Sequence, residues 1–186
     1  MTLNHLSALK RGTTATTLVI GGCRSGKSRY ALDMANQISQ GEKLFIATSV
    51  PTDKDMEERV KKHQKDRGTD WITMEIPVNI PQTIKDYSTS SGVILVDCLT
   101  LWVSNLLLNN LTDDEIFNMA DQLEKALEQS SCPVIFVSNE VGAGIVPENK
   151  LARRFRDTAG FINQKIAAAA DNVVLMAAGI PVKIKP

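Results

Sequence analysis

The sequence carries no excess charge of either sign. Its 21 Lys and Arg residues balance its 21 Asp and Glu residues, so the formal net charge is zero with the two histidines neutral. A basic field of the kind that attracts nucleic acid or anionic lipid is therefore missing, and we expect no nucleic-acid partner. Any anion that the protein binds must be held at a local site.

Cysteine is scarce in this sequence. The three residues, Cys23, Cys98 and Cys132, are odd in number and widely separated, and no Cys-x-x-Cys pair occurs. This spacing argues against a disulfide framework and against a zinc site, and it is typical of proteins from a reducing compartment. We therefore expect a cytoplasmic protein.

Long apolar runs are absent as well. No segment approaches the roughly 18 consecutive apolar residues that a membrane span requires, and the start of the chain lacks the apolar centre of a signal peptide. Residues 1–14 are polar and are expected to form a flexible lead-in. No repeat, linker or compositional break divides residues 15–186, and 43% of the chain is hydrophobic, so we expect one domain with a sizeable core.

Short apolar runs alternate with longer helical patterns along the chain. Several runs are unbroken, as is typical of strands that are buried on both faces of a parallel sheet. The alternation predicts an α/β fold with a mostly parallel sheet flanked by helices, closed by a short carboxyl-terminal edge hairpin. Pro81 and Pro147 mark places where helices begin. The predicted strands are 16–20, 44–47, 72–76, 93–96, 134–137, 173–176 and 181–185, and the predicted helices lie near 26–39, 54–66, 112–130 and 149–170.

The strongest motif is the segment 21–28, Gly-Gly-Cys-Arg-Ser-Gly-Lys-Ser, which fits the pattern GxxxxGK[ST]. It follows an apolar strand and opens an amphipathic helix, as a phosphate-binding loop requires. The glycines let backbone amides turn toward an anion, Lys27 can neutralise the outer phosphates, and the Ser28 hydroxyl can ligate Mg²⁺. Residues 15–186 are therefore expected to form a single nucleotide-binding catalytic domain like that of the P-loop NTPases. Its predicted phosphate-loop contacts are Gly21, Gly22, Cys23, Arg24, Ser25, Gly26, Lys27 and Ser28.

An acidic residue ends one of the buried strands. Asp97 follows Val-Ile-Leu-Val directly, and in a chain with a phosphate loop such a residue is expected to bind Mg²⁺ through water or to activate a substrate hydroxyl. Taken alone, an apolar run that ends in Asp is more often a strand meeting a turn. The phosphate loop makes the functional interpretation the better one.

A histidine lies on the apolar stripe of the predicted helix near 54–66. Met56, Val60 and His63 share one face of that helix, whose other face carries favourable Glu and Lys pairs. The simpler interpretation is a half-buried structural histidine. The alternative is a nucleophile whose imidazole attacks a nucleotide phosphorus and carries the nucleotidyl group as a phosphoramidate. His5 lies in the polar lead-in and is a poor competitor.

Several segments together resemble one enzyme family. From about residue 16 to the carboxyl end, the chain is similar to the bifunctional adenosylcobinamide kinase / adenosylcobinamide-phosphate guanylyltransferase family of cobalamin biosynthesis. The phosphate loop alone is common to many families, whereas the long block 137–160 is highly specific. The segments that carry the resemblance are GGCRSGKS (21–28), IATS (46–49), RVKKH (59–63) with Arg67 and Trp71, VDCLTLW (96–102) and VSNEVGAGIVPENKLARRFRDTAG (137–160).

The resemblance implies two reactions on a corrinoid substrate. The first is phosphorylation of the aminopropanol hydroxyl of adenosylcobinamide, with ATP or GTP as donor. The second is transfer of GMP from GTP to adenosylcobinamide phosphate through a guanylylated histidine, which falls on His63. Some relatives have two adjacent histidines there, whereas this chain has Lys62 before His63. The phosphate loop and the strand-end carboxylate already predict Mg²⁺ and catalytic roles for Lys27 and Asp97. The resemblance adds a homotrimer and nucleotide contacts at Ala47, Thr48, Ser49, Gln64, Lys65, Asp66, Arg67, Glu75 and Asp97.

Other polar residues have open roles at this point. Asn139 and Glu140 follow the carboxyl end of a strand, where ligands of open α/β sheets gather. The spacing of Arg153, Arg154 and Arg156 is most typical of a solvated basic face, although arginine can also bind phosphate or a corrinoid. The bland interpretation of Glu75 is an exposed strand-end carboxylate, and Trp71 and Trp102 are most simply core or interface aromatics.

Two other functions fit part of the same pattern. One is a small-molecule kinase without a transferase step, in which His63 is structural. The other is a non-catalytic regulatory protein that reads nucleotide occupancy. Trapping a labelled nucleotide on the protein would separate the bifunctional enzyme from both.

Overall fold

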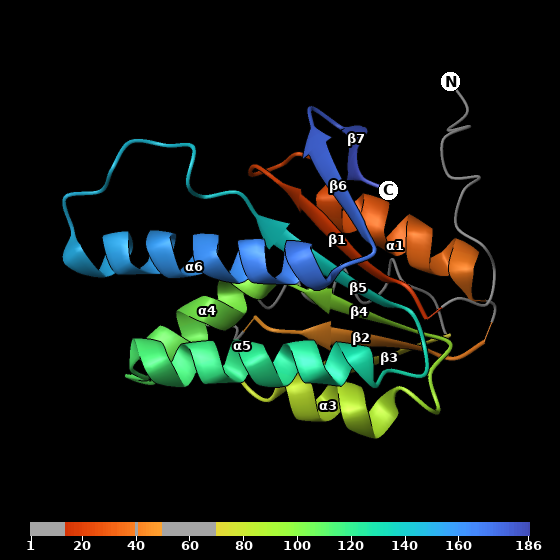
Figure 1. Cartoon of the computed structure of the whole chain (residues 1–186). Coiled ribbons are helices and arrows are strands. Elements are labelled where there is room, and N and C mark those ends of the chain that lie inside the picture. Colours follow the sequence, from red (N-terminus) through yellow and green to blue (C-terminus); the bar gives the residue numbers. More distant parts are fainter. Residues whose placement is uncertain (1–13, 40, 50–69) are drawn as a thin grey trace, which may run out of the picture.

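The computed structural model describes residues 14–39, 41–49 and 70–186. Within them the chain forms one seven-stranded sheet with the strand order β3-β2-β4-β5-β1-β6-β7 (Figure 1). Of the predicted lead-in, only residue 14 is described. The predicted helix near 54–66 lies wholly outside the described residues. The strands are β1 (Thr16–Gly21), β2 (Lys43–Ala47), β3 (Trp71–Glu75), β4 (Val93–Asp97), β5 (Val134–Asn139), β6 (Asn172–Ala177) and β7 (Ile180–Lys185).

The sheet is parallel except at one edge, as predicted. β1 to β6 run in one direction, so their carboxyl ends lie along the same edge of the sheet. β7 pairs antiparallel with β6 and closes the sheet as the expected hairpin. The turn between them has positive φ at Ala178 (51°) and Gly179 (82°), the backbone conformation of the tight hairpin turns that match strand twist.

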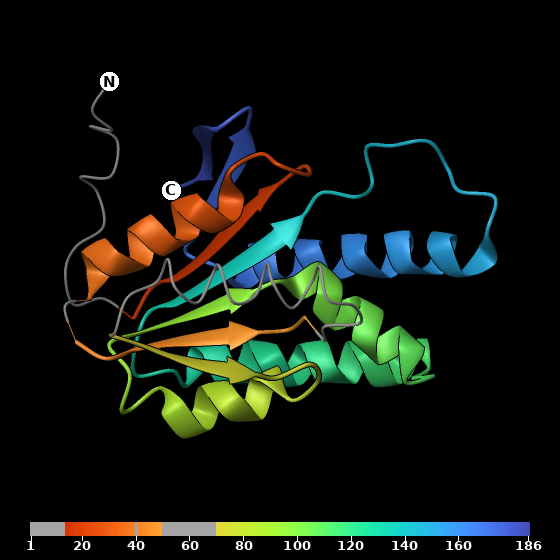
Figure 2. The same cartoon turned by 180° about the vertical axis from the view of Figure 1, so that it is seen from behind.

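Helices cover both faces of the sheet. α1 lies on one face, against β1, β4 and β5, and α3, α4, α5 and α6 lie on the other (Figures 1 and 2). Among the described residues, no helix is both long and apolar enough to cross a membrane. The helices are α1 (Lys27–Ile38), α3 (Ile80–Tyr87), α4 (Leu99–Leu108), α5 (Asp113–Glu128) and α6 (Lys150–Ala169).

Three of the predicted helices are confirmed, and two further helices were not delimited from sequence. Most residues of α4 are buried, and its exposed positions also carry leucines (Leu101 and Leu108), so it shows no clear amphipathic period. α3 is only eight residues long; Pro81 is its second residue, as expected of a proline at a helix start. Pro147 differs from expectation, since α6 begins three residues later and Asn149 caps it by accepting from the Ala152 N–H at 3.0 Å.

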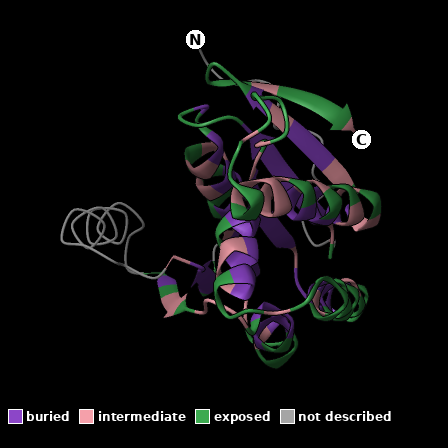
Figure 3. Ribbon diagram, turned by 90° about the vertical axis from the view of Figure 1, so that its left-hand side faces the viewer, coloured by how far each residue is buried: buried purple, intermediate pink, exposed green. Residues whose placement is uncertain are grey.

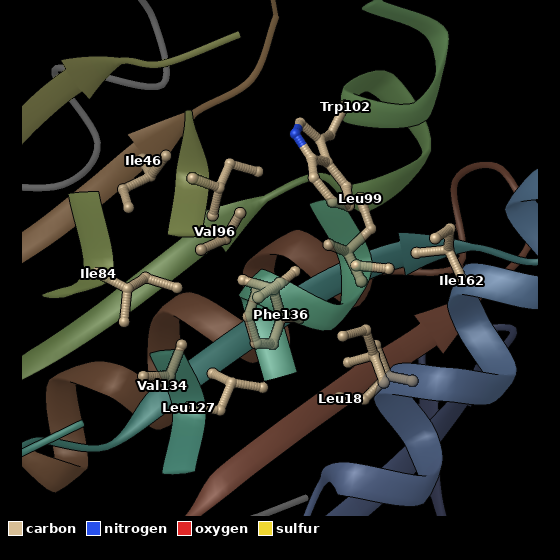
Figure 4. Packing of buried hydrophobic residues seen from close by; sticks show 14 of the residues in the cluster. Leu18, Ile46, Ile84, Val96, Leu99, Trp102, Leu127, Val134, Phe136 and Ile162 are labelled. Carbon is tan, nitrogen blue, oxygen red and sulfur yellow. The ribbon is translucent and has the colours of Figure 1, made fainter. Parts of the chain in front are cut away.

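The core is divided between the two faces by the alternation of strand side chains. Leu18 and Ile20 of β1 pack toward α4, α5 and α6, whereas Val19 packs toward α1. Figure 3 shows the buried strands between covered faces, with β7 largely exposed at the edge. Around Phe136, side chains from β1, β4 and four helices meet (Figure 4). Each such buried side chain contributes about 1.5–3 kcal/mol relative to exposure.

Both tryptophans belong to the core, one of the interpretations left open by the sequence. Trp102 is fully buried, and its indole N–H donates to the Val78 carbonyl oxygen at 2.7 Å. Trp71 is buried on the α1 side, where its indole N–H donates to Asn36 Oδ1 at 3.1 Å. Each ring therefore buries its apolar surface with its one donor satisfied.

Candidate functional site

The phosphate loop joins the end of β1 to the start of α1. β1 ends at Gly21 and α1 begins at Lys27, so residues 22–26 form the turn between them. Arg24 has a φ of 56° and Gly26 a φ of 90°, both in the left-handed region. Glycine adopts this conformation without strain, which explains the residue type at position 26. The loop thus makes the sharp turn that brings backbone amides to a helix start.

The carboxyl-terminal hairpin supports this loop. A Cβ atom at Gly21 would lie 2.5 Å from the Met176 carbonyl oxygen and 2.7 Å from Ser25 Oγ, so no larger residue fits there. The Gly179 N–H donates to the Ser25 carbonyl oxygen at 3.1 Å. Sequence reasoning missed this contact because no local pattern pairs the two segments; the tight turn at Gly179 was the only signal.

Ser25 Oγ is a buried hydroxyl that has no hydrogen-bond partner within the described part of the chain. The residue is 7% exposed, in the middle of the phosphate loop. A buried hydroxyl without a partner costs about 1–3 kcal/mol, so a ligand that supplies an acceptor would be favoured here. Phosphate oxygens are acceptors of this kind.

Lys27 is held by the loop that it follows. The side chain is buried at 9% exposure, and Nζ donates to the Gly22 carbonyl oxygen at 3.0 Å. An ammonium group has three N–H donors, so a phosphate can be bound without breaking this bond. The positive charge also reaches the end of β4, because it opposes the rise in the pKa of Cys98.

Asp97 ends β4, one strand away from the phosphate loop. β5 alone separates β4 from β1, and Asp97 is half-buried at the carboxyl edge. The next residue, Cys98, has a raised pKa chiefly because of burial, and the negative charge of Asp97 raises it further. Asp97 therefore raises the pKa of Cys98 and Lys27 lowers it. Both charges act on this one thiol, so both lie at the same end of the sheet.

Two residues at this edge are of types that could take part in binding Mg²⁺. Among residues 14–39, 41–49 and 70–186, no group of three or more His, Cys, Asp or Glu could hold a metal ion. Mg²⁺ is commonly held by one or two carboxylates together with water and substrate phosphates. Asp97 and the half-buried hydroxyl residue Ser28 are of the types that could hold the cation beside bound phosphates.

The structure brings three further predicted residues to this edge. Ala47 of β2 lies in register with Glu75 of β3 on one side and with Asp97 of β4 on the other. Glu75 is exposed, which also fits the simpler interpretation of an exposed carboxylate at the end of a strand. Thr48 is fully buried, and its hydroxyl bonds the backbone of Cys98. The Thr48 hydroxyl is thus bonded to the residue that joins β4 to α4.

Most of the remaining predicted nucleotide contacts fall within residues 50–69, which the structure does not describe. His63 and the predicted contacts Gln64, Lys65, Asp66 and Arg67 fall outside the described residues. Ser49, the last described residue before this segment, is half-buried and lies two residues beyond the end of β2. The roles of these residues stay predictions.

Asn139 and Glu140 have defined partners. The Asn139 amide nitrogen donates to Thr100 Oγ1 at 2.8 Å, which links β5 to the first turn of α4. The Glu140 N–H donates to the Gly21 carbonyl oxygen at 3.0 Å. Glu140 Oε1 accepts from the Gly142 N–H at 2.7 Å, at the start of the segment that projects from the carboxyl edge (Figures 1 and 2).

The three arginines of α6 do not form a simple solvated face. Arg153 donates to the carbonyl oxygens of Pro147 and Glu148. Arg154 pairs with Asp113 at 2.8 Å and also donates to the Leu111 carbonyl oxygen, which joins α6 to the start of α5. Arg156 pairs with the adjacent Asp157 at 3.2 Å. The three residues are half-buried and their guanidinium groups bind their own chain, while the acidic partners of Arg154 and Arg156 remain exposed.

The structure predicts that one thiol per chain reacts readily. Cys23 is exposed in the phosphate loop, whereas Cys98 and Cys132 are buried. Burial raises the pKa of both buried thiols, so little reactive thiolate forms at about pH 8. Iodoacetamide and peptide mass spectrometry should find Cys23 alone labelled in native protein and all three labelled in urea.

A Cys23→Ser variant is the control and should take up no label while folded. If Cys23 lines a phosphate site, GDP should also slow its labelling in the wild type. Rapid native labelling at Cys98 or Cys132 would contradict the observed burial.

Comparison with solved structures supports the fold. The flagellar accessory protein FlaH from Methanocaldococcus jannaschii superposes with a TM-score of 0.53 at 11% identity, covering 94% of this chain and 80% of that one. A KaiC-like protein from the hyperthermophilic archaeon Pyrococcus horikoshii superposes with a TM-score of 0.50 at 13% identity, covering 87% and 70%. At such low identity the likeness concerns the fold alone, which is that of the P-loop NTPases.

Sequence comparison reaches further. The chain is 42% identical to the bifunctional adenosylcobalamin biosynthesis protein CobU of Salmonella typhimurium, over 90% of this chain and 98% of that protein. It is 37% identical to the corresponding CobP of Pseudomonas aeruginosa, over 90% and 96%. Residues 17–184 match the family described as cobinamide kinase / cobinamide phosphate guanyltransferase. The chain therefore belongs to the CobU family of cobinamide kinases and cobinamide phosphate guanyltransferases.

Proposed function

We propose that this enzyme phosphorylates the aminopropanol hydroxyl of adenosylcobinamide and then transfers GMP from GTP to the new phosphate, giving adenosylcobinamide-GDP. Family membership supports both reactions. The observation that carries the proposal is the phosphate loop, with Lys27 against its backbone and Asp97 one strand away. A cytoplasmic location fits the three unpaired cysteines.

The kinase step follows from the groups around the phosphate loop. Backbone amides of residues 22–26 and the start of α1 bind the phosphates of ATP or GTP, and Lys27 stabilises charge on the transferring group. The aminopropanol hydroxyl loses its proton to water, and its oxygen bonds to the γ-phosphorus as the bond to the bridging oxygen breaks and the nucleoside diphosphate leaves. Asp97 and Ser28 are proposed to hold Mg²⁺, which when bound would neutralise charge on the β- and γ-phosphates.

The transferase step is assigned to His63. Its neutral imidazole attacks the α-phosphorus of GTP, and pyrophosphate leaves with the electrons of the broken bond. The phosphate of adenosylcobinamide phosphate then displaces the histidine. The resemblance of the surrounding segment supports this assignment, and Lys62 stands where some relatives have a second histidine.

We also propose that the protein forms a homotrimer. Apolar side chains are exposed on α5, on α6 and on the segment before α6. Ile145 is 97% exposed, and Phe161 of α6 stacks edge-on against Phe117 of α5 on the surface. Apolar surface of this kind suits contact with a second subunit. The side chains are Phe117, Ile145, Val146, Leu151 and Phe161.

The proposed function is tested by incubating the protein with GTP, Mg²⁺ and adenosylcobinamide and measuring product and protein by mass spectrometry. The corrinoid should gain first a phosphate and then a GMP group, and a fraction of the protein should carry GMP. A phosphorylated corrinoid with no GMP on either partner would favour the kinase-only alternative. An unmodified corrinoid, with GTP bound but intact, would favour the regulatory protein.

A further inference from the structure

The segment from Asp97 to Thr100 joins β4 to α4 and lies between two neighbouring strands. β4 pairs with β2 on one side and with β5 on the other. Cys98 and Thr100 are 5% and 3% exposed, whereas Asp97 is half-buried. Asp97 is therefore the most accessible residue of this turn, and the three residues that follow it are buried.

On the β2 side, Thr48 holds this turn by its backbone and its hydroxyl. The Thr48 N–H donates to the Asp97 carbonyl oxygen at 3.1 Å. Thr48 Oγ1 accepts from the Cys98 N–H at 2.7 Å and donates to the Cys98 carbonyl oxygen at 2.8 Å. Asn105 of α4 donates in turn to the Thr48 carbonyl oxygen at 2.8 Å. Thr48 therefore binds both peptide groups that follow the Asp97 side chain.

On the β5 side, Asn139 holds the turn by its side-chain amide. Its nitrogen donates to Thr100 Oγ1 at 2.8 Å, and Cys98 Sγ lies 3.1 Å from the same hydroxyl. Asn163 of α6, 7% exposed, donates to the Asn139 carbonyl oxygen at 3.1 Å and accepts from Ser138 Oγ at 2.6 Å. Because these buried partners are satisfied, the network is stiff as well as stable.

The β5 end also connects this turn to the phosphate loop. Asn139 lies in register with Gly21, the last residue of β1. The next residue, Glu140, donates its N–H to the Gly21 carbonyl oxygen at 3.0 Å. Asn139, the last residue of β5, thus contacts the turn that carries Asp97, and the residue after it is bonded to the strand that carries the phosphate loop.

We propose that Thr48 and Asn139 are positioning residues, which clamp the Asp97–Thr100 turn from both sides and set the Asp97 carboxylate at a fixed place relative to the phosphate loop. The inference rests on the proposed function, in which Asp97 holds Mg²⁺. Mg²⁺ demands near-ideal octahedral geometry, so a loosely placed carboxylate binds it poorly. Thr48 then serves the nucleotide site through Asp97 instead of by its own hydroxyl.

The test measures metal binding directly, with Mn²⁺ as the probe. Electron paramagnetic resonance follows Mn²⁺ bound by the full-length protein with guanosine 5′-(β,γ-imido)triphosphate. Thr100→Val keeps the shape of the side chain but removes the acceptor for Asn139, and it should weaken Mn²⁺ binding by about tenfold or more, as typical of a partner behind a metal ligand. Thr100→Ser keeps the hydroxyl and should restore affinity to within about threefold of wild type on the same basis.

A second variant tests the other side of the clamp and keeps the test decisive if Thr100→Val does not fold. Thr48→Val removes the hydroxyl that binds Cys98 and should also weaken Mn²⁺ binding, with Thr48→Ser as its rescue. Thr83→Val is the matched control. Thr83 is 7% exposed and donates to the Asn79 carbonyl oxygen at 3.0 Å within α3. This control should lower the melting temperature without changing Mn²⁺ affinity.

Asp97→Asn separates the two proposals. If it leaves Mn²⁺ affinity unchanged, the metal role of Asp97 in the proposed function is wrong and the clamp falls with it. If Asp97→Asn weakens Mn²⁺ binding while folded Thr100→Val and Thr48→Val bind like wild type, the clamp alone is wrong. An equal loss in Thr83→Val would also overturn it, because the effect would then reflect stability.

Discussion

A Lys27→Ala variant is expected to fold normally and to lose kinase turnover by about 10²–10³-fold, the usual loss when one preorganised donor to the transition state is removed. The negative charge that develops on the transferring phosphoryl group is stabilised by a cation already in place. Lys27 is buried against its own loop, with Nζ on the Gly22 carbonyl oxygen, so little reorganisation is needed when the reaction occurs. The alanine side chain carries no charge and so does not stabilise the transition state in this way.

The measurement is steady-state kinase turnover, with circular dichroism and thermal melting to monitor the fold. Lys125→Ala is a suitable control, because it removes an exposed lysine of α5 on the face opposite to α1. Lys27→Arg keeps the charge but changes its shape, and it should fall between alanine and wild type. A folded Lys27→Ala protein with turnover within a few-fold of wild type would mean that the phosphate-loop assignment is wrong.

A His63→Asn variant is expected to lose guanylyl transfer altogether while it keeps kinase activity. If His63 is the nucleophile, GMP forms a phosphoramidate with its imidazole, which divides the exchange into two displacements. Asparagine has a similar size and polarity but no comparably basic nitrogen. The two activities of the enzyme should therefore separate in a single substitution.

The measurement uses GTP labelled at the α-phosphate. Wild-type protein should retain label in a bond that is labile to acid and stable to alkali, and His63→Asn should retain none. His5→Asn is the matched control, since His5 is the other histidine of the chain, and it should label like wild type. Label on Lys62 in the wild type, or label in His63→Asn, would show that the histidine assignment is wrong. Loss of both activities together with folding would favour the structural interpretation of His63.

Elements with a strong local pattern could be predicted from the sequence. The six parallel strands were expected from short apolar runs, several of them unbroken, and each is observed within a few residues of its expected bounds. The phosphate loop could be predicted for the same reason, because its glycines, Lys27 and the helix that follows are neighbours in the chain. α4 could not, since leucines also occupy its exposed positions (Leu101 and Leu108), which leaves no clear polar face to identify a helix.

The sequence by itself therefore determined the parallel α/β fold, the phosphate loop and the carboxylate at the end of β4, because each depends on residues that are close together in the chain. Only the tertiary structure decided which groups meet. Strand order brings Gly179 to the phosphate loop, Thr48 to Cys98 and Asn139 to Thr100. It also gives Arg154 its partner on another helix, where spacing alone indicated a solvated side chain. Such contacts join distant segments, and hydrophobic periodicity carries no information about which strand lies beside which.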